Sequence, residues 1–328
     1  MNVYWISAAG VEQYQVDDLK SLLTREDGFL WVDLPGCDEK AARVLSEAFG
    51  FHPLAVQDCR ERTHVPKVHV YADHLFVILH APEPGAAGHI HLLELDQFVS
   101  RRYLVTVHGP LGEGVALDSA LRETRAMLQR IEAGRFRPGF PAELSYTIVS
   151  ALARRMEALV SSLASKVAAL ERQVMNGRLG DPEKILETMF HLRHELLTVR
   201  TIASHSREGY ARIAKLAPRF MPPEERPFIE DLVDQFDRVR SLCDGEQAFL
   251  QGVIDYYQTR TVTKLNIAME RLALISALLL PVTAIASIYG MNIIVNEQTQ
   301  PMHVVSVLVA IGIIMAVMFL WAKRKQWW

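Results

Sequence analysis

Small polar and flexible residues recur at helical spacing along one long apolar segment near the end of this 328-residue chain. The run from Leu272 to Asn296 carries no formal charge and exceeds the roughly 20 apolar residues that a helix needs to cross a bilayer. The recurring positions are Asn266, Met269, Leu272 or Ala273, Ser276, Leu280, Thr283, Ser287 and Gly290. Because neighbouring members are separated by steps of three or four residues, they share one face of a helix. Such a face is typical of a helix that lines a water-filled path.

The same run ends in Tyr289-Gly290-Met291-Asn292. One polar face per chain cannot enclose a path, so this interpretation requires several copies around a central axis. The Asn292 carboxamides would then ring one mouth of the path. Amide and backbone oxygens suit a hard divalent cation, and magnesium, which dehydrates reluctantly, is best met by groups that hydrogen-bond its water shell. The alternative is that the hairpin only anchors the protein in the membrane. An anchor would not require polar residues to be aligned on one face of the helix.

A second charge-free run, Gln298 to Ala322, follows after a short connection, so the two runs predict a transmembrane hairpin. Arg271 precedes the first run and Lys323-Arg-Lys follows the second, whereas the turn contains no Lys or Arg. The positive-inside rule therefore places both termini in the cytoplasm and the Gly-Met-Asn turn outside. The first residues lack a basic region and a long apolar core, so we expect no signal peptide.

The rest of the chain is expected to form an α+β region followed by long helices. Strand-like runs begin at Phe29, Leu75, Gln97 and Tyr103. Helices are predicted from Asp38 to Phe49, from Asp118 to Ile131, from Pro141 to Asn176, from Pro182 to about Ala217 and, without a break, from Glu224 past Pro281. The expected domains are 1–140 (cytosolic α/β), 141–265 (helical stalk), 266–292 (first membrane helix), 293–303 (external loop), 304–322 (second membrane helix) and 323–328 (basic tail).

The composition of the chain argues against several classes of function. The net charge is −3 and Lys and Arg form no dominant basic patch, so a nucleic-acid partner is not expected. The three cysteines lie far apart and fit reduced, cytosolic thiols. We find no phosphate-binding glycine loop and no arrangement typical of nucleophilic catalysis, so neither a nucleotide nor an enzymatic activity is expected.

Two histidine patterns have metal-like spacing. His89 and His91 would share one face of a strand, and His191 and His194, flanked by Glu187 and Glu195, lie on one helix. Ordinary strand and helix surfaces contain such histidines more often than zinc sites do. We therefore favour the structural interpretation for both patterns.

The chain resembles the CorA-type magnesium channels, the two-span class with a Gly-x-Asn motif. The resemblance rests on Tyr289-Gly-Met-Asn292, on Leu-Pro281-Val-Thr283, on Phe49-Gly-Phe-His-Pro-Leu-Ala-Val-Gln-Asp58 with Val65-Pro-Lys-Val-His-Val-Tyr and Leu75-Phe-Val-Ile-Leu, and on the tail Lys323-Arg-Lys-Gln-Trp-Trp. It implies a homopentameric, funnel-shaped channel with a cytosolic α+β domain, long stalk helices and two transmembrane helices per subunit. It also implies a location in the cell's inner or plasma membrane and Mg²⁺ as both the transported and the regulatory ion.

The resemblance also assigns residues. Gly290, Met291 and Asn292 match the external selectivity motif, and Asp255 matches an acidic ring at the cytosolic mouth. Asn266, Met269, Leu272 and Thr283 match pore-lining positions, with Met269 and Leu272 as the hydrophobic constriction. Asp58 and Asp231 match the pair that binds regulatory divalent ions between neighbouring subunits. From the residues alone, Asp231 would be ordinary charged helix surface.

Two departures from the family pattern matter. Only Glu297 is acidic in the stretch after the motif, so cation recruitment at the mouth is expected to be weak. Gln57 stands where an acidic residue often precedes the regulatory aspartate, which disfavours a second sensing ion. Met291 favours Mg²⁺, with Co²⁺ and Ni²⁺ as further ions, over Zn²⁺, which a related branch transports. A zinc transporter and a membrane-anchored cytosolic scaffold remain the alternatives.

Overall fold

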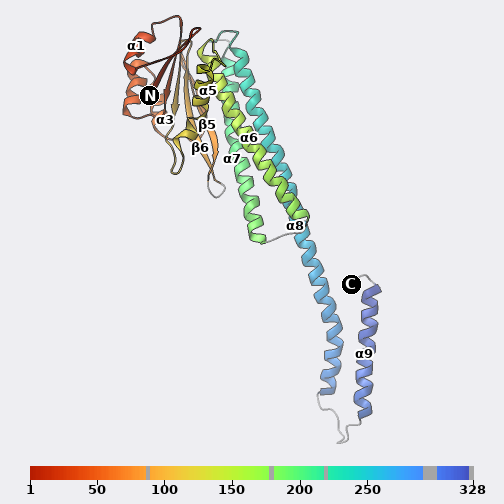
Figure 1. The fold of residues 1–328 in the computed structure, drawn as a ribbon. Helices are drawn as coiled ribbons and strands as arrows, with labels where there is room; N and C mark the ends of the chain where they lie inside the picture. The colour runs from red at the N-terminus through yellow and green to blue at the C-terminus, as the bar shows by residue number, and fades with distance from the viewer. Residues whose placement is uncertain (86–88, 177–180, 218–220, 291–300, 325–328) are drawn as a thin grey trace. The chain divides into compact units, whose positions relative to one another are not determined.

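The structure is a computed structural model that describes residues 1–85, 89–176, 181–217, 221–290 and 301–324. It divides the chain into two units, Met1–Val253 and Ile254–Trp328 (Figure 1), which we call unit 1 and unit 2. The strands are β1 (Asn2–Ser7), β2 (Gly10–Tyr14), β3 (Gly28–Leu34), β4 (Lys67–Val70), β5 (Leu75–Pro84), β6 (Ile90–Val99) and β7 (Tyr103–His108). The longer helices are α3 (Pro53–Arg60), α5 (Arg122–Glu132), α6 (Pro141–Met175), α7 (Pro182–Leu216), α8 (Arg226–Gly290) and α9 (Pro301–Arg324).

The strands form one seven-stranded sheet in the order β2-β1-β3-β7-β6-β5-β4. Only the central β3–β7 pair is parallel, and every other neighbouring pair is antiparallel. The strands predicted near Phe29, Leu75, Gln97 and Tyr103 are confirmed as β3, β5, β6 and β7. Strands β1, β2 and β4 lie outside the strand-like runs predicted from the sequence.

Alternating side chains give the sheet two buried faces. On one face, Phe98 of β6 stacks on Phe51 with ring centroids 3.9 Å apart, in a core that also contains residues of α1 (Leu19–Leu22), α2 (Glu39–Arg43) and α3. On the opposite face, α6 packs against β5, β6 and β7. There the Ser145 hydroxyl donates to the side-chain oxygen of Gln97 at 2.6 Å. The sheet is therefore buried between short helices and the long α6.

The predicted short helices are confirmed with local breaks. The one expected from Asp38 begins where the Asp38 carboxylate accepts from the Ala41 amide, and it continues from α2 into a π-helical turn, Val44–Ala48. It ends before Gly50, whose φ of 69° favours glycine. The helix expected from Asp118 is split at Leu121 into α4 (Leu117–Ala120) and α5. Helix α3 was not predicted.

The long helices match the periodicity of their apolar residues. Helix α6 buries residues at steps of three and four from Leu144 to Val174, and α7 begins where the Asp181 carboxylate accepts from the Glu183 amide at 3.0 Å. Helix α8 is continuous over 65 residues and contains Pro281. It is the single long helix that the sequence predicted.

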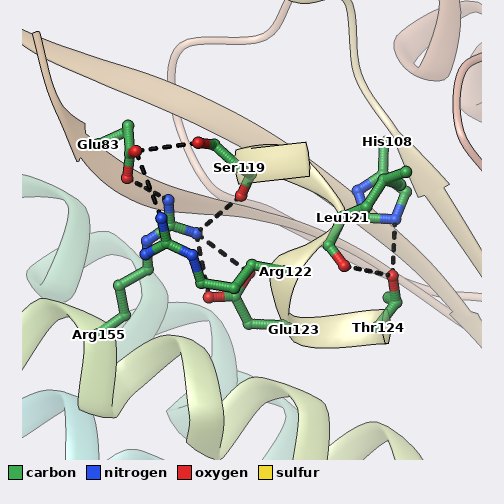
Figure 2. A network of polar contacts seen from close by, with 8 residues as sticks. All are labelled: Glu83, His108, Ser119, Leu121, Arg122, Glu123, Thr124 and Arg155. Carbon is green, nitrogen blue, oxygen red and sulfur yellow. Dashed lines mark hydrogen bonds and ion pairs between the residues drawn. The ribbon is translucent and has the colours of Figure 1, made fainter. Parts of the chain in front are cut away.

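An ion-pair network fixes α4 and α5 to α6 (Figure 2). The Arg155 guanidinium on α6 contacts Glu83 of β5 at 2.5 Å and both oxygens of Glu123 at 3.0 and 3.1 Å. Ser119 and Arg122 also donate to Glu83. Because the Arg155 side chain is only 9% exposed, these pairs hold charges that would otherwise be buried alone.

Unit 2 consists of the later part of α8 and of α9. Within the described residues, α8 is the helix that is both long and apolar enough to cross a membrane, and α9 contributes a shorter apolar helical stretch, Val305–Trp321. Most described side chains of this unit are exposed. A stretch this apolar with almost no buried surface fits a bilayer environment better than water.

Candidate ion pathway and regulatory carboxylates

The polar stripe predicted for the first membrane helix lies on a regular part of α8. An ideal helix turns by about 100° per residue. Asp255, Asn266, Met269, Leu272, Ser276, Thr283 and Ser287 therefore fall within an arc of about 120° on α8. All seven side chains are exposed in the single chain. Lys264, Arg271 and Leu278 project from the other side of the same helix.

Two hydroxyl groups of this stripe are held by the helix itself. Ser276 Oγ donates to the Leu272 carbonyl and Thr283 Oγ1 to the Leu279 carbonyl, each at 2.9 Å. A hydroxyl oxygen has two acceptor lone pairs in addition to its one donor. Because the donor is used within the helix, the outward chemistry of these groups is acceptance. Acceptors are what the hydrogens of a hydrated cation's water shell require.

Two apolar residues, Met269 and Leu272, belong to the N-terminal part of the stripe. Their side chains are 59% and 65% exposed in the single chain. Asp255 lies further toward unit 1, and its backbone carbonyl accepts from Thr259 Oγ1 at 2.9 Å. Gly290 is the last residue of α8. Met291, Asn292, residues 293–300 and residues 325–328 lie outside the described residues.

The two predicted regulatory aspartates belong to unit 1. The partly buried Asp58, on α3, accepts a hydrogen bond from Lys67 Nζ at 3.0 Å. The partly buried Asp231, near the start of α8, accepts from the Tyr146 hydroxyl at 2.7 Å and from the Gln235 amide at 2.5 Å. Both donors use Oδ2, which orients the Asp231 carboxylate and directs Oδ1 elsewhere. Oriented carboxylates of this kind are common among metal ligands.

A buried acidic group that was not predicted from the sequence lies beneath α3. Glu94 and Asp96 are two residues apart on one face of β6, and His80 of β5 is paired with Glu94 in the sheet register. Glu94 Oε2 accepts from the Thr63 amide at 2.6 Å, and His80 Nε2 lies 2.6 Å from the Thr63 carbonyl. The alternation in Leu93-Glu94-Leu95-Asp96 was the available signal, since it places both carboxylates on the same face of a strand.

Burial dominates the ionisation of this group. It raises the pKa of Glu94 to about 7, with a further contribution from the negative charge of Asp58. Burial, followed by the charge of Glu94, raises the pKa of Asp96 well above its usual range. Burial lowers the pKa of His80. The group therefore favours neutral side chains, since two adjacent buried carboxylates resist double ionisation.

The histidine patterns do not assemble a metal centre in the part of the chain that the structure describes. No group of three or more His, Cys, Asp or Glu residues there is arranged to hold a metal ion. His191 Nε2 lies 3.6 Å from Glu187, whereas the His194 ring stacks on Phe190. Glu195 is buried and faces Lys166 at 3.8 Å. Any divalent ion bound through Asp58 or Asp231 would thus require further ligands, from water or from another copy.

An α+β domain followed by a long helix whose later part is apolar enough to cross a membrane is the architecture of a membrane protein. Residues 26–324 match the family model described as CorA-like Mg²⁺ transporter protein, and the chain belongs to this family. It is 22% identical over 324 residues to the cobalt/magnesium transport protein CorA of Thermotoga maritima, covering 96% of this chain and 88% of that protein. It is 24% identical over 298 residues to YfjQ of Bacillus subtilis, covering 90% and 89% of the two chains.

Solved structures share the fold. The complete structure of the CorA magnesium transporter from Methanocaldococcus jannaschii superimposes with a TM-score of 0.81 at 17% identity, covering 100% of this chain and 99% of that chain. The expected fold class is thereby confirmed in its α+β N-terminal domain, its long helix and its C-terminal segment.

Proposed function

We propose that this protein is a homopentameric channel through which Mg²⁺, and with it Co²⁺ and Ni²⁺, enters the cell down its electrochemical gradient. It lies in the inner or plasma membrane with both termini in the cytoplasm. Gly290, Met291 and Asn292 form the external filter, and the stripe from Asp255 to Ser287 lines the path. Two charges crossing 100 mV supply about 4.6 kcal/mol, so no nucleotide is required.

The observation that carries this proposal is the arc of polar side chains on α8. A helix that only tethers a protein to a membrane gains nothing from hydroxyl and amide groups on one side. Ser276 and Thr283 keep their acceptor lone pairs outward because their hydroxyl hydrogens are used by the helix. Family membership supports the same conclusion independently.

Flux through reconstituted vesicles tests the path. Asn292→Ala and Thr283→Val should each lower Mg²⁺ uptake, Asn292→Ala by about tenfold or more, because they remove groups that replace bulk water around the ion. Leu278→Ala is the matched control, because it also shortens a side chain of α8 but projects from the side opposite the stripe. Uptake of Co²⁺, Ni²⁺ and Zn²⁺ in the same vesicles ranks the ions, and a preference for Zn²⁺ would favour the zinc alternative.

A membrane-anchored scaffold makes the opposite prediction. In that case all three variants would behave alike, Mg²⁺ uptake would not exceed that of empty vesicles, and the purified protein would not need to be pentameric. Mass measurement of the detergent-purified protein distinguishes the assemblies. A monomer with normal uptake would exclude a path enclosed by several copies.

Regulation is proposed to use Asp58 and Asp231. Cytosolic Mg²⁺ bound between Asp58 of one copy and Asp231 of the next would hold the channel closed. When the ion leaves, the carboxylates repel each other and the ring formed by Met269 and Leu272 can hydrate. Carboxylate oxygens and water are the ligands that Mg²⁺ prefers, and Tyr146 already orients Asp231.

This regulation predicts that Asp231→Ala gives a channel less inhibited by internal Mg²⁺. Asp234→Ala is the matched control, because Asp234 is an exposed aspartate one turn along α8. Uptake should be measured at internal Mg²⁺ concentrations from micromolar to tens of millimolar. Equal inhibition of wild type and Asp231→Ala would contradict the assignment and leave the path through the membrane untouched.

A further inference from the structure

Asp58 is already paired with a positively charged side chain of its own subunit. Lys67 Nζ lies 3.0 Å from Asp58 Oδ1, and the two side chains are 41% and 27% exposed. Lys67 is the first residue of β4, the strand at one edge of the sheet, whereas Asp58 is on α3. A partly exposed pair of this kind is weak enough to exchange and close enough to exclude a second cation from the same oxygen.

The positive charge of Lys67 also acts on two acidic residues other than Asp58. It opposes the raised pKa values of Glu94 and Asp96, and Arg62 acts with it at Glu94. The electrostatic influence of Lys67 therefore reaches Glu94 and Asp96 as well as Asp58. Removing its charge would make this whole region more attractive to cations, since unlike charges at this depth are only partly screened.

Displacement of the Lys67 ammonium group from Asp58 would not bury its charge. The Lys67 side chain is 41% exposed where it meets Asp58. Lys67 also borders an open cavity of about 490 Å³ between β4 and α7, whose lining includes Glu208 and Arg212. A displaced ammonium group would thus remain solvated.

We propose that Lys67 competes internally for the regulatory carboxylate, so that a divalent cation binds Asp58 only by displacing the lysine ammonium group. This inference rests on the proposed regulation by Asp58. In consequence, Lys67 sets the cytosolic concentration at which the channel closes. A tethered monovalent charge weakens ion binding without removing any ligand, which keeps the sensor from saturating at low Mg²⁺.

The test uses full-length protein in two independent measurements. The first is the internal Mg²⁺ concentration that halves uptake in vesicles. The second is the Mg²⁺ concentration at which the melting temperature of the detergent-purified protein has risen by half of its maximal shift. Lys67→Met keeps most of the length of the side chain and removes its charge, and it should lower both midpoints by about threefold to fivefold, because the ion no longer has to displace a cation.

Three further variants make the result decisive. Arg212→Met removes a positive charge from the same cavity without touching the Asp58 pair, and it should leave both midpoints within about twofold. Asp58→Asn should abolish the shift. Lys67→Arg, which can form a two-pronged pair with a carboxylate, should raise the midpoints, and it provides the test if Lys67→Met does not fold.

The outcomes separate the two proposals. If the midpoints of Lys67→Met equal those of wild type, Lys67 does not compete for Asp58 and the inference is wrong. Where Lys67→Met does not fold, the same conclusion follows from wild-type midpoints in Lys67→Arg. If wild type shows neither inhibition nor a melting shift with Mg²⁺, the regulatory role of Asp58 itself fails. If Lys67→Met raises the midpoints, Lys67 supports ion binding and the inference is wrong.

Discussion

Unit 1 and unit 2 differ in where their apolar side chains lie. Unit 1 buries a continuous core on both faces of its sheet, including the fully buried rings of Trp5, Trp31 and Phe98. Among the described side chains of unit 2, the buried hydrophobic ones are Tyr257 and Leu274. The first unit therefore contains its own source of stability, since burial of apolar surface is the main driving force for folding in water.

The polar groups of the two units differ in the same way. In unit 1, the buried Arg155 is paired with Glu83 and Glu123, and burial favours the neutral forms of Glu94 and Asp96. In unit 2, Ser276 and Thr283 are exposed on the part of α8 from Leu272 to Gly290, which carries no formal charge. Unit 1 thus has the interior of a domain that folds in water. The surface of unit 2 fits a lipid environment.

The largest effect should come from breaking the Arg155 network in unit 1. Arg155→Ala leaves Glu83 and Glu123 without their main partner in a mostly buried site, which should destabilise unit 1 by about 3–5 kcal/mol. Arg122→Ala is the control, because its contact with Glu83 is longer, 3.4 Å, and its side chain is 53% exposed. That change should cost less than about 1 kcal/mol.

Thermal unfolding of the detergent-purified protein, followed by circular dichroism, measures both changes. A domain the size of unit 1 loses about 2–4 °C in melting temperature for each kcal/mol. Equal shifts for Arg155→Ala and Arg122→Ala would show that burial does not set the strength of this network. The contrast between the interiors of the two units would then lose its strongest example.

A smaller effect should appear as a pH dependence that belongs to unit 1. Burial raises the pKa of Glu94 to about 7 from an ordinary value of 4.5, so the folded state binds its proton more tightly than the unfolded state does. The stability that this proton contributes is full below about pH 4.5 and is lost as the pH rises through about 7. Its upper limit is roughly 3 kcal/mol, since each pKa unit corresponds to about 1.4 kcal/mol.

Melting temperatures from pH 5 to pH 8 test this linkage. Wild type should become less stable toward pH 8, and Glu94→Gln, which can still accept from the Thr63 amide, should show a flatter profile. Glu26→Gln is the control, because its side chain is 82% exposed, and it should keep the wild-type slope. A slope that survives in Glu94→Gln would assign the dependence to another group, of which Asp96 is the nearest candidate.

The ease of prediction also differs between local and non-local features. The long helices were predicted almost to their ends, because an apolar repeat, the Asp181 cap and the absence of proline between Pro227 and Pro281 are all local signals. The run Val3–Ile6 is as rich in β-branched and aromatic residues as the predicted strands, yet β1 was not proposed. Its place beside β3 depends on pairing with a strand more than 20 residues away.

The candidate site shows the same difference between local and non-local features. The stripe on α8 could be predicted because it is a periodicity within one helix. The contacts of Asp58 with Lys67 and of Asp231 with Tyr146 join different elements, and no spacing rule encodes them. The burial of Glu94 and Asp96 beneath α3 has the same origin. Functional groups that lie on one helix or strand can be predicted from the sequence, whereas sites assembled from several elements require knowledge of the fold.

The smallest effect concerns the contact by which α7 lies against the edge strand of the sheet. Gly209 of α7 faces Val68 of β4 so closely that an added Cβ would lie 2.7 Å from Val68 Cγ2. Gly209→Ala should therefore destabilise unit 1 by about 1 kcal/mol, the overpacking exceeding the gain in helix propensity. Gly245→Ala on α8 is the matched control, because its Cβ would meet no atom within 4 Å. That change should stabilise the protein by up to about 1 kcal/mol.

A double substitution decides whether the contact itself is responsible. If the 2.7 Å approach to Val68 Cγ2 is the cause, Val68→Ala combined with Gly209→Ala should be more stable than the sum of the two single effects predicts. Melting temperatures of the four proteins provide the coupling energy. Strict additivity would mean that the helix and the edge strand adjust independently. Because β4 also carries Lys67, a rigid contact here would link the position of α7 to the carboxylate of Asp58.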